Sequence, residues 1–180
     1  HDTILFFSNK GKLYRLRGYE IPEAGRTAKG TAIVNLLSLD AGEKISAVIP
    51  INNFAEGKYL LMATKNGLIK KTALTEYNSA RKTGLQAITL KEDDELITVK
   101  LTDGEDNIVL VTTGGMCITF DEKDVRPMGR TAQGVIGIKL SDDDSVIGME
   151  SVIGGSNTTL LTITENGFGK RTELDEYRVQ

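Results

Sequence analysis

The stretch Tyr59-Leu-Leu-Met-Ala-Thr-Lys-Asn-Gly67 reads as a β-strand that ends in a tight turn. Its apolar run has strand length, and Asn-Gly supplies the positive φ that a two-residue hairpin requires. The pattern recurs at Thr3-Ile-Leu-Phe-Phe-Ser-Asn-Lys-Gly11, Ile108-Val-Leu-Val-Thr-Thr-Gly-Gly115 and Thr159-Leu-Leu-Thr-Ile-Thr-Glu-Asn-Gly167. The four closing glycines lie 56, 48 and 52 residues apart, near the period of about 40–50 residues typical of four-stranded blades.

A second glycine divides each of the three complete repeats, at Gly30, Gly84 and Gly134. We expect a short strand after each one, carrying the apolar pairs Val34 and Leu36, Ile88 and Leu90, and Ile138 and Leu140. An acidic turn and a fourth strand should follow, at residues 45–49, 96–101 and 146–152. A shared core position is predicted ten residues after each first glycine, at Ile21, Tyr77, Val125 and Tyr177.

Four strands per repeat, short turns and almost no amphipathic helix predict an all-β, propeller-like array of four-stranded blades. About three and a half blades are expected, with approximate bounds 2–57, 58–106, 107–157 and 158–180, the last truncated. Because the chain opens in a strand and stops inside its fourth repeat, we expect it to be part of a longer chain. No apolar run approaches the roughly 20 residues of a membrane-spanning helix.

The formal net charge of −3 hides an uneven distribution. In the first two repeats, the segments that run from just before the first glycine to the second, 9–30 and 65–84, each carry a charge of +4. The equivalent segment of the third repeat, 113–134, is neutral. The remaining parts, 37–57, 85–107 and 135–158, carry −2, −5 and −3. In a wheel of blades these segments would form a basic belt and a separate acidic face. Charge alone leaves open whether the belt binds phosphate or only keeps the surface soluble.

The basic segments contain glycine-flanked loops. Gly25-Arg26-Thr27-Ala28-Lys29-Gly30 and Gly129-Arg130-Thr131-Ala132-Gln133-Gly134 share one pattern, and Arg81-Lys82-Thr83-Gly84 is a shorter variant. Arginine, lysine, threonine and free backbone N–H groups all suit phosphate oxygens. A purely structural loop would use glycine in the same way, so these loops alone do not establish a binding site.

Several stretches resemble the C-terminal domain family of the DNA gyrase A subunit. They are Ala32-Ile33-Val34-Asn35-Leu36-Leu37, Met62-Ala63-Thr64-Lys65-Asn66-Gly67 with Lys70-Lys71-Thr72, Val125-Arg126-Pro127-Met128-Gly129 with Gly134-Val135-Ile136-Gly137-Ile138, and Asn166-Gly167-Phe168-Gly169-Lys170-Arg171-Thr172. The resemblance runs through essentially the whole chain in order. The related domain of topoisomerase IV fits less well. The family's defining box, Gln-Arg-Arg-Gly-Gly-Lys-Gly, is absent, and residues 25–30 are its degenerate counterpart.

The resemblance implies a six-bladed β-pinwheel in which neighbouring blades exchange strands and duplex DNA wraps around a basic rim. Such wrapping would direct strand passage towards negative supercoiling. The partners would be DNA and the other parts of gyrase, namely its B subunit with the rest of its A subunit, in the cytoplasm and nucleoid of a bacterium. The catalytic tyrosine, the ATP site and Mg²⁺ would belong to other parts of the holoenzyme, so this chain should need no cofactor.

Two sets of residues are the predicted DNA contacts. The loops contribute Arg26, Lys29, Arg81, Lys82 and Arg130. The following strands contribute a second set, part of which could instead pair with the acidic turns: Lys12, Arg15, Lys70, Lys71, Lys170 and Arg171. The third repeat should bind DNA least, because its charges cancel.

Two alternatives compete with DNA binding. A protein-interaction propeller would use the basic belt for acidic partners. An enzyme is disfavoured because the single histidine is His1 and no nucleophile, base and orienting group share a motif. The single cysteine, Cys117, has no partner for a metal site. The acidic runs at 93–94 and 142–144 recur at the same turn, which favours solvated turns over a cation site.

Overall fold

The computed structural model describes residues 2–153, 158–177 and 179, so His1 and the end of the third predicted repeat lie outside it. The described residues confirm the all-β prediction. The strands are β1 (Thr3–Ser8), β2 (Lys12–Arg17), β3 (Ile45–Ile51), β4 (Tyr59–Thr64), β5 (Leu68–Ala73), β6 (Leu85–Gln86), β7 (Leu96–Thr102), β8 (Asn107–Thr112), β9 (Cys117–Asp121), β10 (Val135–Ile136), β11 (Val146–Val152), β12 (Thr159–Ile163) and β13 (Gly169–Glu173). Short 3-10 helices are η1 (Gly18–Glu20), η2 (Ile33–Asn35), η3 (Leu74–Tyr77), η4 (Glu122–Asp124) and η5 (Leu174–Glu176).

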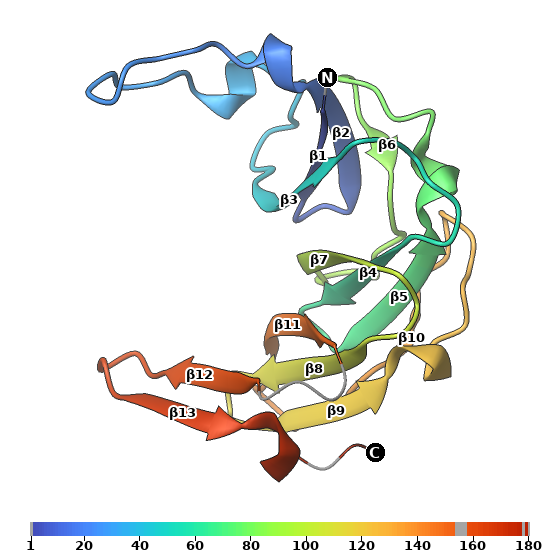
Figure 1. Cartoon of the computed structure of the whole chain (residues 1–180), viewed down its shortest axis with the longest axis vertical. Helices are drawn as coiled ribbons and strands as arrows, with labels where there is room; N and C mark the ends of the chain where they lie inside the picture. The colour runs from blue at the N-terminus through green and yellow to red at the C-terminus, as the bar shows by residue number, and fades with distance from the viewer. Residues whose placement is uncertain (1, 154–157, 178, 180) are drawn as a thin grey trace.

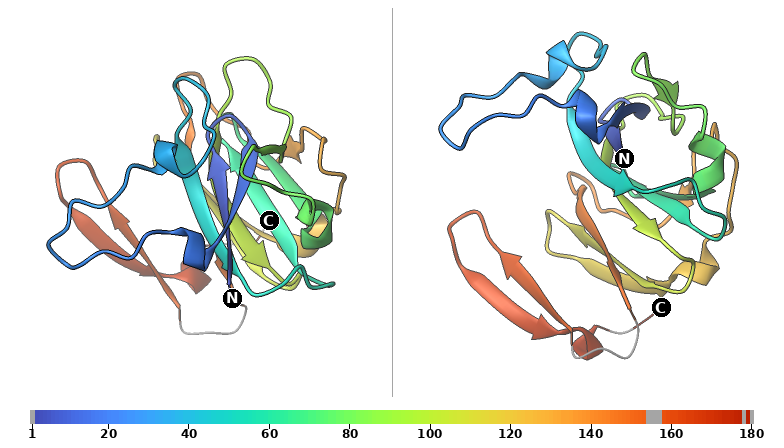
Figure 2. Two further views of the ribbon diagram at one scale, coloured as in Figure 1. Left: turned by 90° about the horizontal axis from the view of Figure 1, so that it is seen from above. Right: turned by 45° about the horizontal axis from the view of Figure 1, so that its top comes forward.

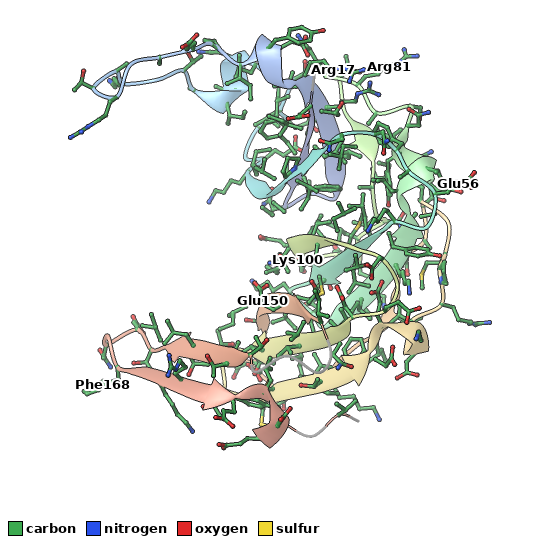
Figure 3. The ribbon with its side chains drawn as sticks, viewed as in Figure 1. Arg17, Glu56, Arg81, Lys100, Glu150 and Phe168 are labelled. Carbon is green, nitrogen blue, oxygen red and sulfur yellow. The ribbon has the colours of Figure 1, made fainter. Side chains whose placement is uncertain are left out.

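The strands form four antiparallel sheets, here called blades 1 to 4. Their strand orders are β3-β1-β2-β6, β7-β4-β5-β10, β11-β8-β9 and β12-β13. The blades follow one another in an arc, with β3, β7 and β11 on its concave side (Figure 1). These three inner strands contact each other in sequence, and an ion pair of 2.8 Å between Lys100 and Glu150 joins β7 to β11 (Figure 3).

Each hairpin turn has the geometry that its sequence predicts. Gly11, Gly67, Gly115 and Gly167 have φ values of 74°, 85°, 81° and 81°, a region that glycine enters without steric cost. The predicted fourth strands are also confirmed, as β3, β7 and β11.

The hydrophobic core lies between neighbouring blades. On β4, Leu60 and Met62 pack towards blade 1, whereas Leu61 and Ala63 pack towards blade 3, and all four are fully buried. Successive strand residues point to opposite faces of a sheet. Blade 2 is therefore covered on both faces, which explains why β4 is a continuous apolar run and not an alternating one.

The strands after the second glycines differ from the prediction. They are only two residues long, and each pairs with the preceding blade: β6 with β2, and β10 with β5. Ile88 and Ile138 lie beyond them, with backbone N–H groups directed to the carbonyls of Gly11 and Gly67. Neighbouring blades thus exchange strands.

The first repeat has a 3-10 helix, η2, in place of the expected strand. The described residues contain no preceding blade for this segment to join. Residues 33–39 instead pack against the apolar face of blade 1 around Phe6 and Leu16. The predicted core position holds for Tyr77 and Val125, which are buried, but is wrong for Ile21, which is 37% exposed at the start of the segment 21–32 between η1 and η2. Figure 2 shows that segment projecting away from the arc in both views.

Among the described residues, no helix has the length and apolar character needed to cross a membrane.

Candidate nucleic-acid interface

The exchanged strands carry two basic loops to the outer edges of the blades. Residues 78–84 lead into β6 at the edge of blade 1, and residues 126–134 lead into β10 at the edge of blade 2. Both loops lie on the convex side of the arc in Figure 1. Arg81 and Arg130 therefore occupy comparable places on successive blades.

Close backbone packing fixes where these loops cross the edge. A Cβ on Gly84, where φ is 91°, would lie 2.9 Å from the Tyr14 ring. A Cβ on Gly134, where φ is 99°, would lie 2.6 Å from the carbonyl oxygen of Ile69. Real Cβ atoms do not come so close to another heavy atom, and residues other than glycine disfavour positive φ. The second glycines of the sequence pattern are thus crossing points between blades.

Arg26 and Lys29 lie apart from these two loops. Both are exposed in the projecting segment, on the other side of blade 1 from the convex edge (Figure 1). Among the described residues, neither side chain has an ion pair or a hydrogen bond. They present free positive charge, but the structure does not bring them together with Arg81 and Arg130.

The cations of the two outer-edge loops differ in how far they are engaged. Arg81 is exposed. Lys82 is also exposed and forms a 2.6 Å ion pair with Glu20, a contact that contributes little in solvent. Arg130 is half-buried, and its Nη1 donates to the carbonyl of Gln86 at 2.8 Å. That acceptor is neutral, so Arg130 keeps its full charge at the rim.

On β2, Lys12 is tied to the acidic turn. Its Nζ lies 2.6 Å from Asp40 Oδ2, and this hydrogen bond raises the pKa of Lys12 and lowers that of Asp40. Arg15 is half-buried, donates to the carbonyl of Asn78 at 3.1 Å, and stacks 5.3 Å from the centre of the Phe54 ring.

Lys70 and Lys71 lie in the core, which corrects the expectation that they contact DNA. Lys70 is completely buried, and its ammonium group donates to the carbonyls of Ala87 and Arg130. Burial lowers the pKa of Lys70 to about 8. Lys71 is 4% exposed. Because both faces of blade 2 are covered, alternation along β5 does not direct either lysine to solvent.

Lys71 belongs to a polar cluster that links blades 2 and 3. Its Nζ lies 3.3 Å from Glu122 Oε1 and 4.7 Å from the centre of the Tyr59 ring. The Glu122 carboxylate is fully buried, and it also accepts from the Thr102 hydroxyl at 2.5 Å. The cluster is structural.

The remaining predicted contacts, Lys170 and Arg171, are exposed on β13 of blade 4. No ion pair involves either side chain among the described residues. They stay available to a polyanion.

Arg17 is a basic residue that contributes to the charge of its segment but lies outside the predicted set of DNA contacts. It alternates with Arg15 along β2, so the two side chains lie on the same face. This spacing of two residues is the sequence feature from which Arg17 could have been predicted together with Arg15. Its Nη1 donates to Thr3 Oγ1 at 2.8 Å.

Each acidic turn stabilises the hairpin end of its own blade. Asp94 Oδ1 accepts from the backbone N–H groups of Asn66 and Glu95, both at 2.9 Å. Asp144 Oδ1 accepts from the N–H of Gly114 at 2.8 Å, and hydrogen bonds from the neighbouring threonines and backbone lower its pKa to about 2. In the part of the chain that the structure describes, no group of three or more potential ligands could hold a metal ion.

Comparison with known proteins places this fold. A family described as "DNA gyrase C-terminal domain, beta-propeller" matches residues 2–52, 58–103, 106–153 and 158–180. The DNA gyrase A subunit of Salmonella typhimurium is 49% identical over 177 residues, which are 98% of this chain and 20% of that protein. The gyrase A subunit of Staphylococcus epidermidis is 45% identical over 180 residues, which are 99% of this chain and 20% of that protein. The chain thus spans about a fifth of these relatives' length.

Solved structures agree with that grouping. The C-terminal domain of DNA topoisomerase IV superposes with a TM-score of 0.91 and 34% identity, covering 99% of this chain and 55% of that one. The DNA gyrase A C-terminal domain superposes with a TM-score of 0.83 and 29% identity, covering 100% of this chain and 57% of that one. The sequence relatives are A subunits of gyrase, and the family model covers most of the repeats. This chain belongs to the C-terminal domain family of the DNA gyrase A subunit.

Proposed function

We propose that this chain binds duplex DNA along its convex edge and bends it, as the non-catalytic DNA-wrapping part of a DNA gyrase A subunit. The observation that carries the proposal is the comparable placement of Arg81 and Arg130 on the outer edges of successive blades. Neither guanidinium is neutralised by a carboxylate among the described residues. Successive cations along a curved edge form a path that a phosphate backbone can follow.

Wrapping must overcome the stiffness of DNA. Bending a site of 20–30 base pairs by 40–90° costs roughly 1–6 kcal/mol. Each phosphate contact releases condensed counterions, which favours binding without any reading of bases. A few such contacts per blade can offset the bending cost. The acidic turns lie at the other ends of the strands, where they would repel the duplex and help confine it to the outer edge.

Within a holoenzyme, strand cleavage and passage would come from the rest of the A subunit together with the B subunit, ATP and Mg²⁺. The wrapped segment would present a crossing of fixed hand and so direct the reaction towards negative supercoiling. This role places the chain with the DNA in a bacterial cytoplasm. The related gyrase A subunits are about five times as long as this chain.

The test compares duplexes of 15 and 60 base pairs over a range of salt concentrations. We expect the longer duplex to bind more tightly than its larger number of sites explains, with a steep fall of log K against log salt. Replacing Arg81→Gln and Arg130→Gln together should reduce the slope by about two. The matched control is Lys91→Gln with Lys139→Gln, which removes two exposed charges near the acidic turns.

A flat salt slope would refute the proposal. So would an equal loss of duplex affinity in the Arg81→Gln, Arg130→Gln variant and in the control variant. Binding of a single-stranded or non-nucleic polyanion as tightly as the 60-base-pair duplex would favour the alternative, a protein-interaction propeller that takes acidic partners.

A further inference from the structure

A cavity of about 320 Å³ opens beside β2 where blade 1, the β3–β4 connection and the residue after η3 meet. It lies at the end of the blade opposite the acidic turn, because Thr3 starts β1, Arg17 ends β2, and Asn52 follows β3. Its polar lining consists of Thr3, Arg15, Arg17, Asn52, Asn53 and Asn78. Carboxylates are missing from this lining as the structure describes it.

The two arginines are held in place by neutral partners. Arg15 is fixed by the Asn78 carbonyl and the Phe54 ring, and Arg17 by the Thr3 hydroxyl. These contacts orient the guanidinium groups, and neither group forms an ion pair among the described residues. Glu20, the acidic residue nearest to Arg17 along the chain, attracts the Arg17 charge, but its carboxylate is shared, because its Oε2 accepts from the Arg17 backbone N–H at 2.7 Å and its Oε1 pairs with Lys82.

The same place in the next blade is filled differently. Pairing of Thr3 with Arg17 and of Tyr59 with Ala73 makes Lys71 the counterpart of Arg15. The buried Glu122 carboxylate neutralises Lys71 at 3.3 Å. The cation of blade 2 is thus compensated by a carboxylate of blade 3, whereas Arg15 of blade 1 has no ion pair with a carboxylate among the described residues.

The flanking residues follow the same contrast. Pairing of β1 with β3 and of β4 with β7 makes Asp103 the counterpart of Asn52. A carboxylate therefore stands in blade 2 where blade 1 has a neutral amide. Blade 1 combines two oriented guanidinium groups with side-chain amides around an open cavity.

We propose that this cavity is a phosphate-binding site, and that it receives one backbone phosphate of the bound duplex. Guanidinium forks bind phosphate oxygens through paired, charge-assisted hydrogen bonds, and amide and hydroxyl groups add neutral donors. The assignment of DNA as the ligand rests on the proposed function; the assignment of an anion rests on the cavity alone.

The cavity is continuous with the first basic loop of the outer edge. The Arg15 backbone N–H donates to the Arg81 carbonyl at 3.3 Å, and Figure 3 shows Arg17 and Arg81 at the same end of blade 1. A phosphate in the cavity would therefore adjoin the loop that carries Arg81 and Lys82. The sequence pattern predicts this loop as a DNA contact but does not predict the cavity next to it.

The experiment follows the amide signals of the ¹⁵N-labelled chain by NMR during titration with inorganic phosphate, and separately with a 20-base-pair duplex. Sodium chloride at matched ionic strength is the control titration. We expect both ligands, but not chloride, to shift the signals of Asn52, Asn53 and Asn78. Asn52→Asp, which introduces the carboxylate of the second blade, should remove these shifts and reduce the salt slope of duplex binding by about one.

Arg15→Gln with Arg17→Gln should act like Asn52→Asp, whereas Lys91→Gln with Lys139→Gln should leave the phosphate shifts intact. If the phosphate shifts were unchanged in Asn52→Asp, or were confined to other residues, the phosphate site would be refuted. The proposal that the chain binds duplex DNA would not be refuted by that result. Phosphate shifts in a chain that binds no duplex would keep the anion site and refute both DNA as its ligand and the proposed function.

Discussion

The substitution Glu122→Gln should destabilise the contact between blades 2 and 3, and it should lower the free energy of unfolding more than a substitution at the surface does. The substitution keeps the size of the side chain and its acceptor for the Thr102 hydroxyl, but removes the charge that compensates Lys71. The two groups are 0% and 5% exposed and 3.3 Å apart. Coulomb's law gives about 5 kcal/mol for this separation at an effective dielectric constant of about 20.

Breaking a buried ion pair from one side typically costs about 3–5 kcal/mol, because it leaves an uncompensated charge in the core. We therefore expect Glu122→Gln to lower the free energy of unfolding by about that amount. The exposed pair of Lys123 with Glu105, at 57% and 69% exposure, provides the control, and Lys123→Gln should cost less than about 1 kcal/mol.

The measurement is urea denaturation of both single variants, Lys71→Met and Glu122→Gln, and of their combination. The double variant removes both charges, so it should recover most of the loss and give a coupling energy of about 3 kcal/mol. A cost below about 1 kcal/mol for Glu122→Gln, or additive single effects, would show that this pair does not join the two blades.

Two further predictions concern the exchanged segments. Gly134→Ala should reduce amide protection of β10 in hydrogen exchange and cost at least about 1–3 kcal/mol, because its Cβ would meet backbone at positive φ. Gly129→Ala, which has open space around it, should be near neutral. Equal protection of β10 in both variants would refute the role of Gly134 as a crossing point between blades. Because burial lowers the pKa of Lys70 to about 8 from 10.5, the unfolded chain holds more protons than the folded chain between these values. The free energy of unfolding should therefore rise with pH across that window, by at most about 1.4 kcal/mol per unit, and a Lys70→Met variant that rose equally would contradict this.

The repeat, the hairpins and the inner strands could be predicted from local signals. Asn-Gly and Gly-Gly turns demand positive φ, and apolar runs of strand length lie between them. These features depend on residues close in the chain. The bounds of β3, β7 and β11 therefore agree with the expectation to within a few residues.

The burial of Lys70 and Lys71 could not be predicted, because it depends on what covers β5. A lysine in a strand normally marks a solvent face, but here both faces of β5 are covered. On one face Lys70 meets the carbonyls of Ala87 and Arg130, and on the other Lys71 meets the Glu122 carboxylate. The shortness of β6 and β10, and the 3-10 helix in the first repeat, have the same cause. The path of each segment is set by the neighbouring blade and not by its own residues.

Bending of DNA is the central claim, and energy transfer between dyes at the two ends of a 40-base-pair duplex tests it most directly. Saturation with the chain should raise the transfer efficiency, and Arg81→Gln with Arg130→Gln at the same degree of saturation should raise it less. Saturated binding with no change in end-to-end transfer would contradict the account, since it would show a chain that holds DNA without curving it.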